Sequence, residues 1–124
     1  MKLHHTADAP SAVGPYSQAT SVDGWLFTAG QVGIDPATGR LAPGGFEPEA
    51  RQVLANLRAI LRSSGADFDR VVKTTVFLAD LADFGRLNQI YAEAIGDHRP
   101  ARTTVQVAAL PLGAAVEIDM VARL

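Results

Sequence analysis

The sequence predicts a single domain, residues 1–124, in which two helices cover one face of a single β-sheet. Amphipathic helical patterns at residues 47–63 and 80–95 are each followed by a stretch of strand character. Further strand patterns precede the first helix and end the chain. Elements in this order indicate one sheet with its helices in a second layer. With 124 residues, 48% of them hydrophobic, the chain is large enough for one core.

Two strands are expected before the first helix. Gly14-Pro15 breaks any helix and favours extended structure, so a strand should begin at Tyr16. Asp23-Gly24 is typical of a hairpin turn, and residues 25–32 read as the second strand. Gly30 would weaken that strand unless a ligand or a neighbouring chain approaches its backbone. Tyr16 either packs beneath the sheet or belongs to a site.

The helices have clear apolar stripes and ends. The first stripe consists of Ala50, Val53, Leu54, Leu57 and Leu61, and its arginines are most simply a solvated face. The second helix should stop at Gly96. Asn88 lies near its apolar side, beside Phe84 and Tyr91. A buried amide needs a hydrogen-bond partner, which is either a structural group or a ligand.

Three strands complete the prediction. Residues 71–78 are rich in β-branched side chains and indicate a central strand covered on both faces. Residues 102–107 and 116–121 alternate with a period of two, and the connection at 110–114 could join them as an antiparallel hairpin.

That hairpin would bring Arg102, Glu117 and Asp119 onto one polar face. An arginine fork binds a carboxylate through two parallel hydrogen bonds, and a nearby Glu117 can position a water and accept its proton. The alternative is a structural ion pair between Arg102 and Glu117. Asp119 is the weaker acid candidate and reads as a network or interface residue.

Composition excludes several kinds of site. The net charge of −2 leaves no basic footprint for nucleic acid, and the absence of cysteine excludes disulfides and thiolate chemistry. The three histidines, His4, His5 and His98, lack the spacing of metal ligands. The absence of cysteine also fits a cytoplasmic protein. The sequence contains no signal peptide or membrane-length apolar run. The other face of the sheet carries Thr, Gln, Gly and Ala rather than Lys and Glu, so we expect a homo-oligomer with Arg102 and Glu117 near the contact.

Several short motifs occur in order along nearly the whole chain. The most specific are Gly14-Pro15-Tyr16-Ser17-Gln18-Ala19, Ala29-Gly30-Gln31-Val32, Val71-Val72-Lys73-Thr74-Thr75-Val76-Phe77-Leu78, Pro100-Ala101-Arg102 and Val116-Glu117-Ile118. With these motifs the sequence resembles the RidA family, also called YjgF or L-PSP proteins. The resemblance implies a chorismate-mutase-like α+β fold, with one mixed sheet and two helices on one face. It also implies a homotrimer with a site at each subunit interface.

The resemblance implies an enzyme that hydrolyses 2-imino acids, such as 2-iminobutanoate and 2-iminopropanoate (2-aminoacrylate), to 2-keto acids and ammonia, without a cofactor or metal. By this resemblance Arg102 binds the substrate carboxylate and Glu117 holds or activates water. The substrate-binding residues that we expect are Tyr16 from the adjacent subunit, Gly30, Asn88, Thr104 and Pro111.

The sequence departs from the family pattern at three places, and these departures concern the identity of the substrate more than the reaction. Ala29 stands where many relatives have serine, and Thr104 where one branch has cysteine. The short loop before Pro100 resembles the aminoacrylate-processing, RutC-like branch. Two other classes of function remain: a ribonuclease or translation inhibitor, whose basic groove is missing here, and a non-catalytic module that binds keto acids through Arg102.

Overall fold

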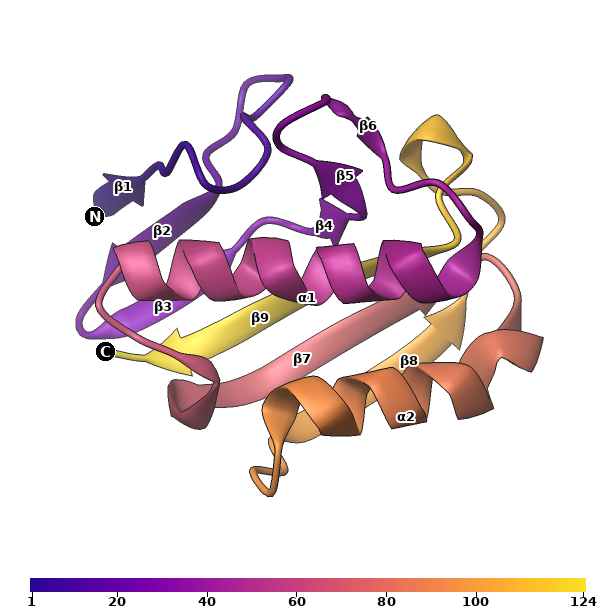
Figure 1. Ribbon diagram of the computed structural model, residues 1–124. Helices are drawn as coiled ribbons and strands as arrows, with labels where there is room; N and C mark the ends of the chain where they lie inside the picture. Colours follow the sequence, from indigo (N-terminus) through magenta and orange to yellow (C-terminus); the bar gives the residue numbers. More distant parts are fainter.

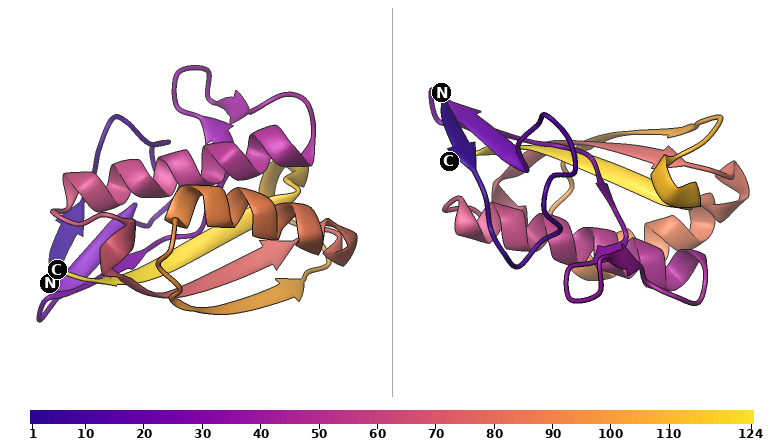
Figure 2. Two further views of the ribbon diagram at one scale, coloured as in Figure 1. Left: turned by 60° about the horizontal axis from the view of Figure 1, so that its bottom comes forward. Right: turned by 90° about the horizontal axis from the view of Figure 1, so that it is seen from above.

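A mixed sheet of seven strands carries both helices on one of its faces (Figures 1 and 2). The computed structural model describes residues 1–124. In chain order, the strands of this sheet are β1 (Lys2–His4), β2 (Ala19–Val22), β3 (Trp25–Thr28), β4 (Gln31–Val32), β7 (Val71–Leu78), β8 (Ala101–Gln106) and β9 (Val116–Arg123). Their spatial order is β1-β2-β3-β9-β7-β8, with β4 also paired to β9. Only β7 and β8 are parallel.

The two helices are α1 (Phe46–Ser63), close to its predicted bounds, and α2 (Phe84–Ile95), which ends as predicted but begins after the predicted start at Asp80 because a 3₁₀ turn occupies residues 81–83. Short 3₁₀ turns precede β7, α2 and β9: η1 (Phe68–Arg70), η2 (Leu81–Asp83) and η3 (Pro111–Gly113). A separate two-stranded ribbon of β5 (Ile34–Asp35) and β6 (Arg40–Leu41) projects beside α1 (Figure 1). Neither helix has the length and apolar character needed to cross a membrane.

The core lies between the helices and the sheet. The predicted stripe of α1 is buried throughout, as are Val116, Ile118 and Met120 of β9. Alternation along β9 therefore directs its apolar residues to the helices and Glu117 and Asp119 to the opposite face, which we call the open face.

The predicted strand at residues 25–32 is interrupted. Phe27 pairs with Val121 and Gln31 with Ile118, so four steps along one strand oppose three along β9. The extra residue makes a bulge that divides the strand into β3 and β4. The prediction that a strand begins at Tyr16 is wrong, because β2 starts at Ala19 and Tyr16 lies in the preceding loop.

The loop before β2 is tied down by Gln18, which is 2% exposed. Its amide oxygen accepts a hydrogen bond from the Thr6 N–H at 2.7 Å, and its amide nitrogen donates to the Pro10 carbonyl at 2.8 Å. These bonds hold residues 6–10 against the sheet, in a stretch for which the sequence predicted no regular structure. The sequence likewise predicted no strand at β1, which lies next to this loop.

The expected hairpin of the last two strands is wrong. Strand β7 lies between β8 and β9, pairing parallel with the first and antiparallel with the second. Strand β7 is thus central, as predicted, but this chain buries only one of its faces. The pairing partner of β8 comes from residues 71–78, far away in sequence, and no local turn signal reveals such a partner.

Asp67 links the end of α1 to η1. Its carboxylate accepts hydrogen bonds from Arg58 Nε at 3.0 Å, Arg62 Nε at 2.9 Å and the Phe68 N–H at 2.7 Å. Burial raises the pKa of Asp67, but the hydrogen bonds from Arg58, Phe68 and Arg62 outweigh it and lower the pKa to about 2.

Replacing this carboxylate should destabilise the fold. We expect Asp67→Ala to lower the free energy of unfolding by about 1–2 kcal/mol at neutral pH, because it removes a cap and two partly exposed ion pairs. Since the folded pKa lies below the ordinary value of 3.8, the charge contributes above 3.8 and its contribution is lost as the pH falls through about 2. Urea unfolding of the wild type and Asp67→Ala across this pH range measures the difference in the free energy of unfolding. Asp67→Asn keeps a capping oxygen and should lose less, and a penalty independent of pH would contradict the assignment.

Candidate active site

Arg102 lies on the helix face of the sheet, not on the face that carries Glu117. It pairs in register with Thr74, which is fully buried beneath α2. One guanidinium nitrogen, Nη2, donates to Asn88 Oδ1 at 2.6 Å. The guanidinium also lies over the rings of Phe84, at 5.5 Å, and Tyr91, at 4.9 Å.

Three residues one helical turn apart on α2 therefore fix the position of Arg102. Within the chain, the amide oxygen of Asn88 has Arg102 as its hydrogen-bond partner. Tyr91 is itself held by a hydrogen bond of 3.0 Å between its hydroxyl and that of Thr74. Two cation–π contacts and one charge-assisted hydrogen bond restrict the guanidinium but leave most of its N–H groups free.

The free side of Arg102 faces a hollow of about 350 Å³. Its lining residues are Asn88, Tyr91, Ala92, Arg99, Pro100 and Arg102. None of them is acidic, and no ion pair involves Arg102. An unneutralised, fixed guanidinium in a hollow of this size is suited to a small anionic ligand.

Thr104 adds a backbone donor beside Arg102. The Val107 N–H donates to the Leu78 carbonyl at 2.9 Å, so the N–H groups of odd-numbered residues of β8 point toward β7. The Thr104 N–H therefore points outward along the free edge of the sheet. We call Asn88, Tyr91, Arg102 and Thr104 the arginine half-site.

Glu117 occupies a second cluster on the open face. A Cβ placed on Gly30 would lie 2.9 Å from both Cδ and Oε1 of Glu117, so the bulge at Gly30 makes room for this carboxylate. Within the chain, the group that lies closest to Gly30 is therefore the side chain of Glu117. Gly30 and Tyr16 line a common small hollow of about 50 Å³. We call Tyr16, Gly30 and Glu117 the glutamate half-site.

Tyr16 is exposed rather than packed beneath the sheet. Its side chain is 52% accessible, and its hydroxyl accepts a hydrogen bond from the Val13 N–H at 3.3 Å. Pro111, in η3, is exposed as well and lies in the connection that leads to β9. It belongs to neither half-site within the chain.

The environment of Glu117 favours the action of its carboxylate as a general base. Burial, with a smaller contribution from the Asp119 carboxylate, raises the pKa of Glu117 above its ordinary value. Burial also raises the pKa of Asp119, against hydrogen bonds from Thr75 and the charge of Lys73. A carboxylate whose pKa is moved toward neutrality is a better proton acceptor than an ordinary one.

The two half-sites cannot act on one small molecule within a single chain. Arg102 and Glu117 are separated by two strand spacings and three residues along the strands, about 14 Å between backbones, and point to opposite faces. The prediction that they share one polar face is therefore wrong, and so is the alternative of an ion pair between them. The polarity of β8 was misleading because the charged guanidinium of Arg102 lies over aromatic rings of α2, on the face of the sheet that the helices cover.

Comparison with known proteins places the chain in a family. A family model described as endoribonuclease L-PSP matches residues 6–124. The chain belongs to this family. A curated L-PSP relative, the 2-iminobutanoate/2-iminopropanoate deaminase of Mus musculus, is 53% identical over 121 residues, covering 98% of this chain and 90% of the relative. The Homo sapiens protein of the same name is 51% identical over 117 residues, covering 94% and 85%.

Solved structures of L-PSP proteins agree over the whole chain. RidA from an Antarctic Psychrobacter is 42% identical with a TM-score of 0.96, covering 100% of both chains. E. coli TdcF with bound serine is 35% identical with a TM-score of 0.94, covering 100% of this chain and 99% of that one. These matches confirm the α+β fold with two helices on one face of a mixed sheet.

The space that Gly30 leaves for Glu117 can be tested directly. We expect Gly30→Ala to reduce kcat for imine hydrolysis roughly 10- to 100-fold, because a displacement of about 1 Å is enough for such a loss. Stability should change little, since the clash is with the flexible end of a side chain. Gly85→Ala is the matched control: its added methyl meets no atom within 4 Å, in a helix where alanine is favourable. Equal activities of the two variants would argue against this role of Gly30.

Proposed function

We propose that the protein is an enzyme that hydrolyses reactive 2-imino acids, among them 2-iminobutanoate and 2-iminopropanoate, to 2-keto acids and ammonia. The observation that carries the proposal is the fixed guanidinium of Arg102 facing a hollow without a counter-charge. The names of the Mus musculus and Homo sapiens relatives support the same reaction.

In this proposal the carboxylate of the imine binds Arg102 through parallel hydrogen bonds, with the outward Thr104 N–H as a further donor. The protonated imine is electrophilic at C2. Glu117 accepts a proton as water attacks C2, giving a carbinolamine, and returns this proton to the nitrogen. The C–N bond then breaks as the carbinolamine hydroxyl loses its proton, which the departing ammonia takes up to become ammonium. The products are a 2-keto acid and ammonium, so no metal or redox partner takes part in the balance.

The complete site would lie between two copies of the chain. We assign the arginine half-site to one protomer and the glutamate half-site, with Tyr16, to its neighbour in a trimer. The open face supports such assembly, because it exposes large apolar side chains on four strands: Leu3, Val22, Trp25, Phe27 and Val105. Apolar side chains gathered on one face favour a protein contact.

A coupled assay separates the candidate functions. A pyridoxal-phosphate-dependent threonine dehydratase generates the free imine, which semicarbazide traps as a measurable semicarbazone. An imine hydrolase lowers semicarbazone formation without changing threonine consumption. A binding module would bind 2-ketobutyrate and leave trapping unchanged. RNA cleavage that survives in Arg102→Ala, with no effect on trapping by the wild type, would instead support the endoribonuclease description of the family.

A further inference from the structure

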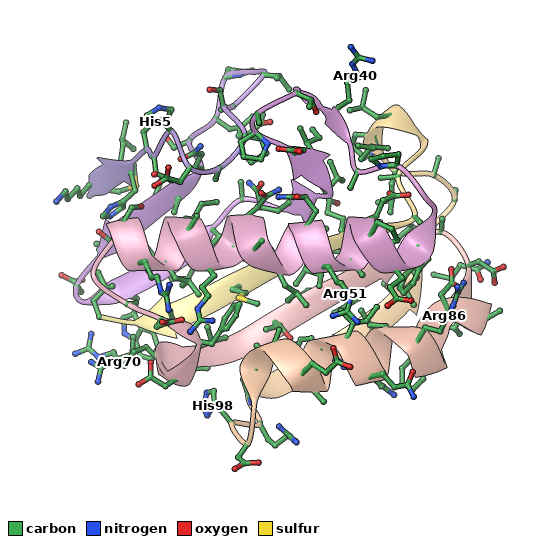
Figure 3. The ribbon with its side chains drawn as sticks, viewed as in Figure 1. His5, Arg40, Arg51, Arg70, Arg86 and His98 are labelled. Carbon is green, nitrogen blue, oxygen red and sulfur yellow. The ribbon has the colours of Figure 1, made fainter.

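A second arginine borders the same hollow as Arg102. Arg99 belongs to the loop between α2 and β8, near His98, which is labelled in Figure 3. Its Nη1 donates to the Gly96 carbonyl and, at 2.9 Å, to the His98 carbonyl. These bonds hold one corner of the guanidinium on the loop, while Nε and Nη2 have no protein partner.

The charge of Arg99 has no counter-ion in the chain. Four arginines on or next to the helices, Arg51, Arg58, Arg62 and Arg86, are paired with carboxylates. Arg99 and Arg102 are not, although Asp97 is only two residues from Arg99. Pro100 lies between the two arginines and limits the backbone freedom of the segment that carries both.

The hollow is also larger than a three-carbon imine requires. A volume of about 350 Å³ corresponds to roughly a dozen waters at ~30 Å³ each. A ligand whose carboxylate is held by Arg102 therefore leaves space on the side of Arg99. Within one chain, this hollow is bordered by two unpaired cations and no acid, and such a lining is complementary to a molecule with two anionic groups.

We infer that Arg99 is a specificity residue that selects 2-imino and 2-keto acids with a second, side-chain carboxylate. This inference rests on the proposed function for the imino acids, since it places the substrate C2 near Arg102. Arg102 holds the carboxylate next to C2, and Arg99 holds the distal one through its free Nε and Nη2.

Binding of the keto acids tests this inference independently of turnover. Calorimetry should compare 2-ketoglutarate with 2-ketopentanoate, which has the same five-carbon chain but no distal carboxylate. We expect 2-ketoglutarate to bind the wild-type protein about tenfold more tightly, the effect of one charge-assisted hydrogen bond. Arg99→Ala should remove this preference, and Arg99→Lys should keep part of it.

Arg40→Ala is the matched control. Arg40 is exposed and has no ion pair, and Figure 3 shows it at the opposite end of the molecule from His98. The preference for 2-ketoglutarate should be unchanged in this variant. Equal binding of the two keto acids by the wild type, or a preference that survives Arg99→Ala, would overturn the inference.

Hydrolysis distinguishes failure of this inference from failure of the proposed function. L-Glutamate oxidase with catalase supplies 2-iminoglutarate, and the threonine dehydratase assay supplies 2-iminobutanoate. We compare kcat/KM for the diacid with kcat/KM for the monoacid. In Arg99→Ala, we expect the ratio of these two values to fall about tenfold. Turnover of the monoacid with an unchanged ratio sinks the inference alone. Failure to hydrolyse either imine sinks the proposed function, while the keto-acid binding still decides the role of Arg99.

Discussion

Arg102→Ala should reduce kcat/KM for 2-iminobutanoate about a thousandfold. The variant loses both the charge that binds the substrate carboxylate and the fork that orients C2 toward the water, each of which contributes several kcal/mol to such reactions. Most of the loss should appear in KM if Arg102 only binds, and in kcat as well if it also orients. The semicarbazide assay with varied imine supply separates the two.

The effect of Arg102→Ala on activity can be separated from its effect on stability. Arg102 is only partly buried, and the Thr74–Tyr91 hydrogen bond does not depend on it. The cost to folding should be the two cation–π contacts, about 1–2 kcal/mol in total. Arg102→Lys keeps the charge above the rings but lacks the planar fork, so it should fall between wild type and Arg102→Ala. Wild-type activity in Arg102→Ala would end the proposal that this residue binds substrate.

The helices could be predicted from sequence because their signals are local. The stripe of α1 repeats every three to four residues, and Gly65 and Gly96 mark the helix ends with positive φ. The Asp23-Gly24 turn is equally local, and it joins β2 to β3 as predicted, both residues having positive φ.

The arrangement of the site could not be predicted in this way. The faces of Arg102 and Glu117 depend on which strand separates β8 from β9, and that strand is β7, more than twenty residues upstream. The alternation of residues correctly predicted which side chains share a face within β8 and within β9. It did not predict whether the two strands are neighbours in the sheet. The family resemblance selected the residues; the strand order determines that they form two half-sites.

Glu117→Gln should lower kcat roughly 10²- to 10⁴-fold with a much smaller change in KM. The amide can still hold a water but cannot accept its proton. Since burial and Asp119 raise the pKa of Glu117, the folded chain disfavours the carboxylate, and removing the charge should leave the thermal midpoint unchanged or higher at neutral pH. A loss of activity with equal or greater stability distinguishes a chemical role from a structural one.

The raised pKa of Glu117 also determines the direction in which kcat/KM changes with pH. Glu117 must be deprotonated to act, so kcat/KM should fall on the acid side at a pH above the ordinary value of 4.5 for glutamate. Asp119→Asn removes the neighbouring negative charge, lowers the pKa of Glu117 and should move this acid limb to lower pH. A limb that stays in place in Asp119→Asn, or moves upward, would show that another group controls it. The sign of the shift thus tests whether the carboxylate beside Gly30 handles the proton.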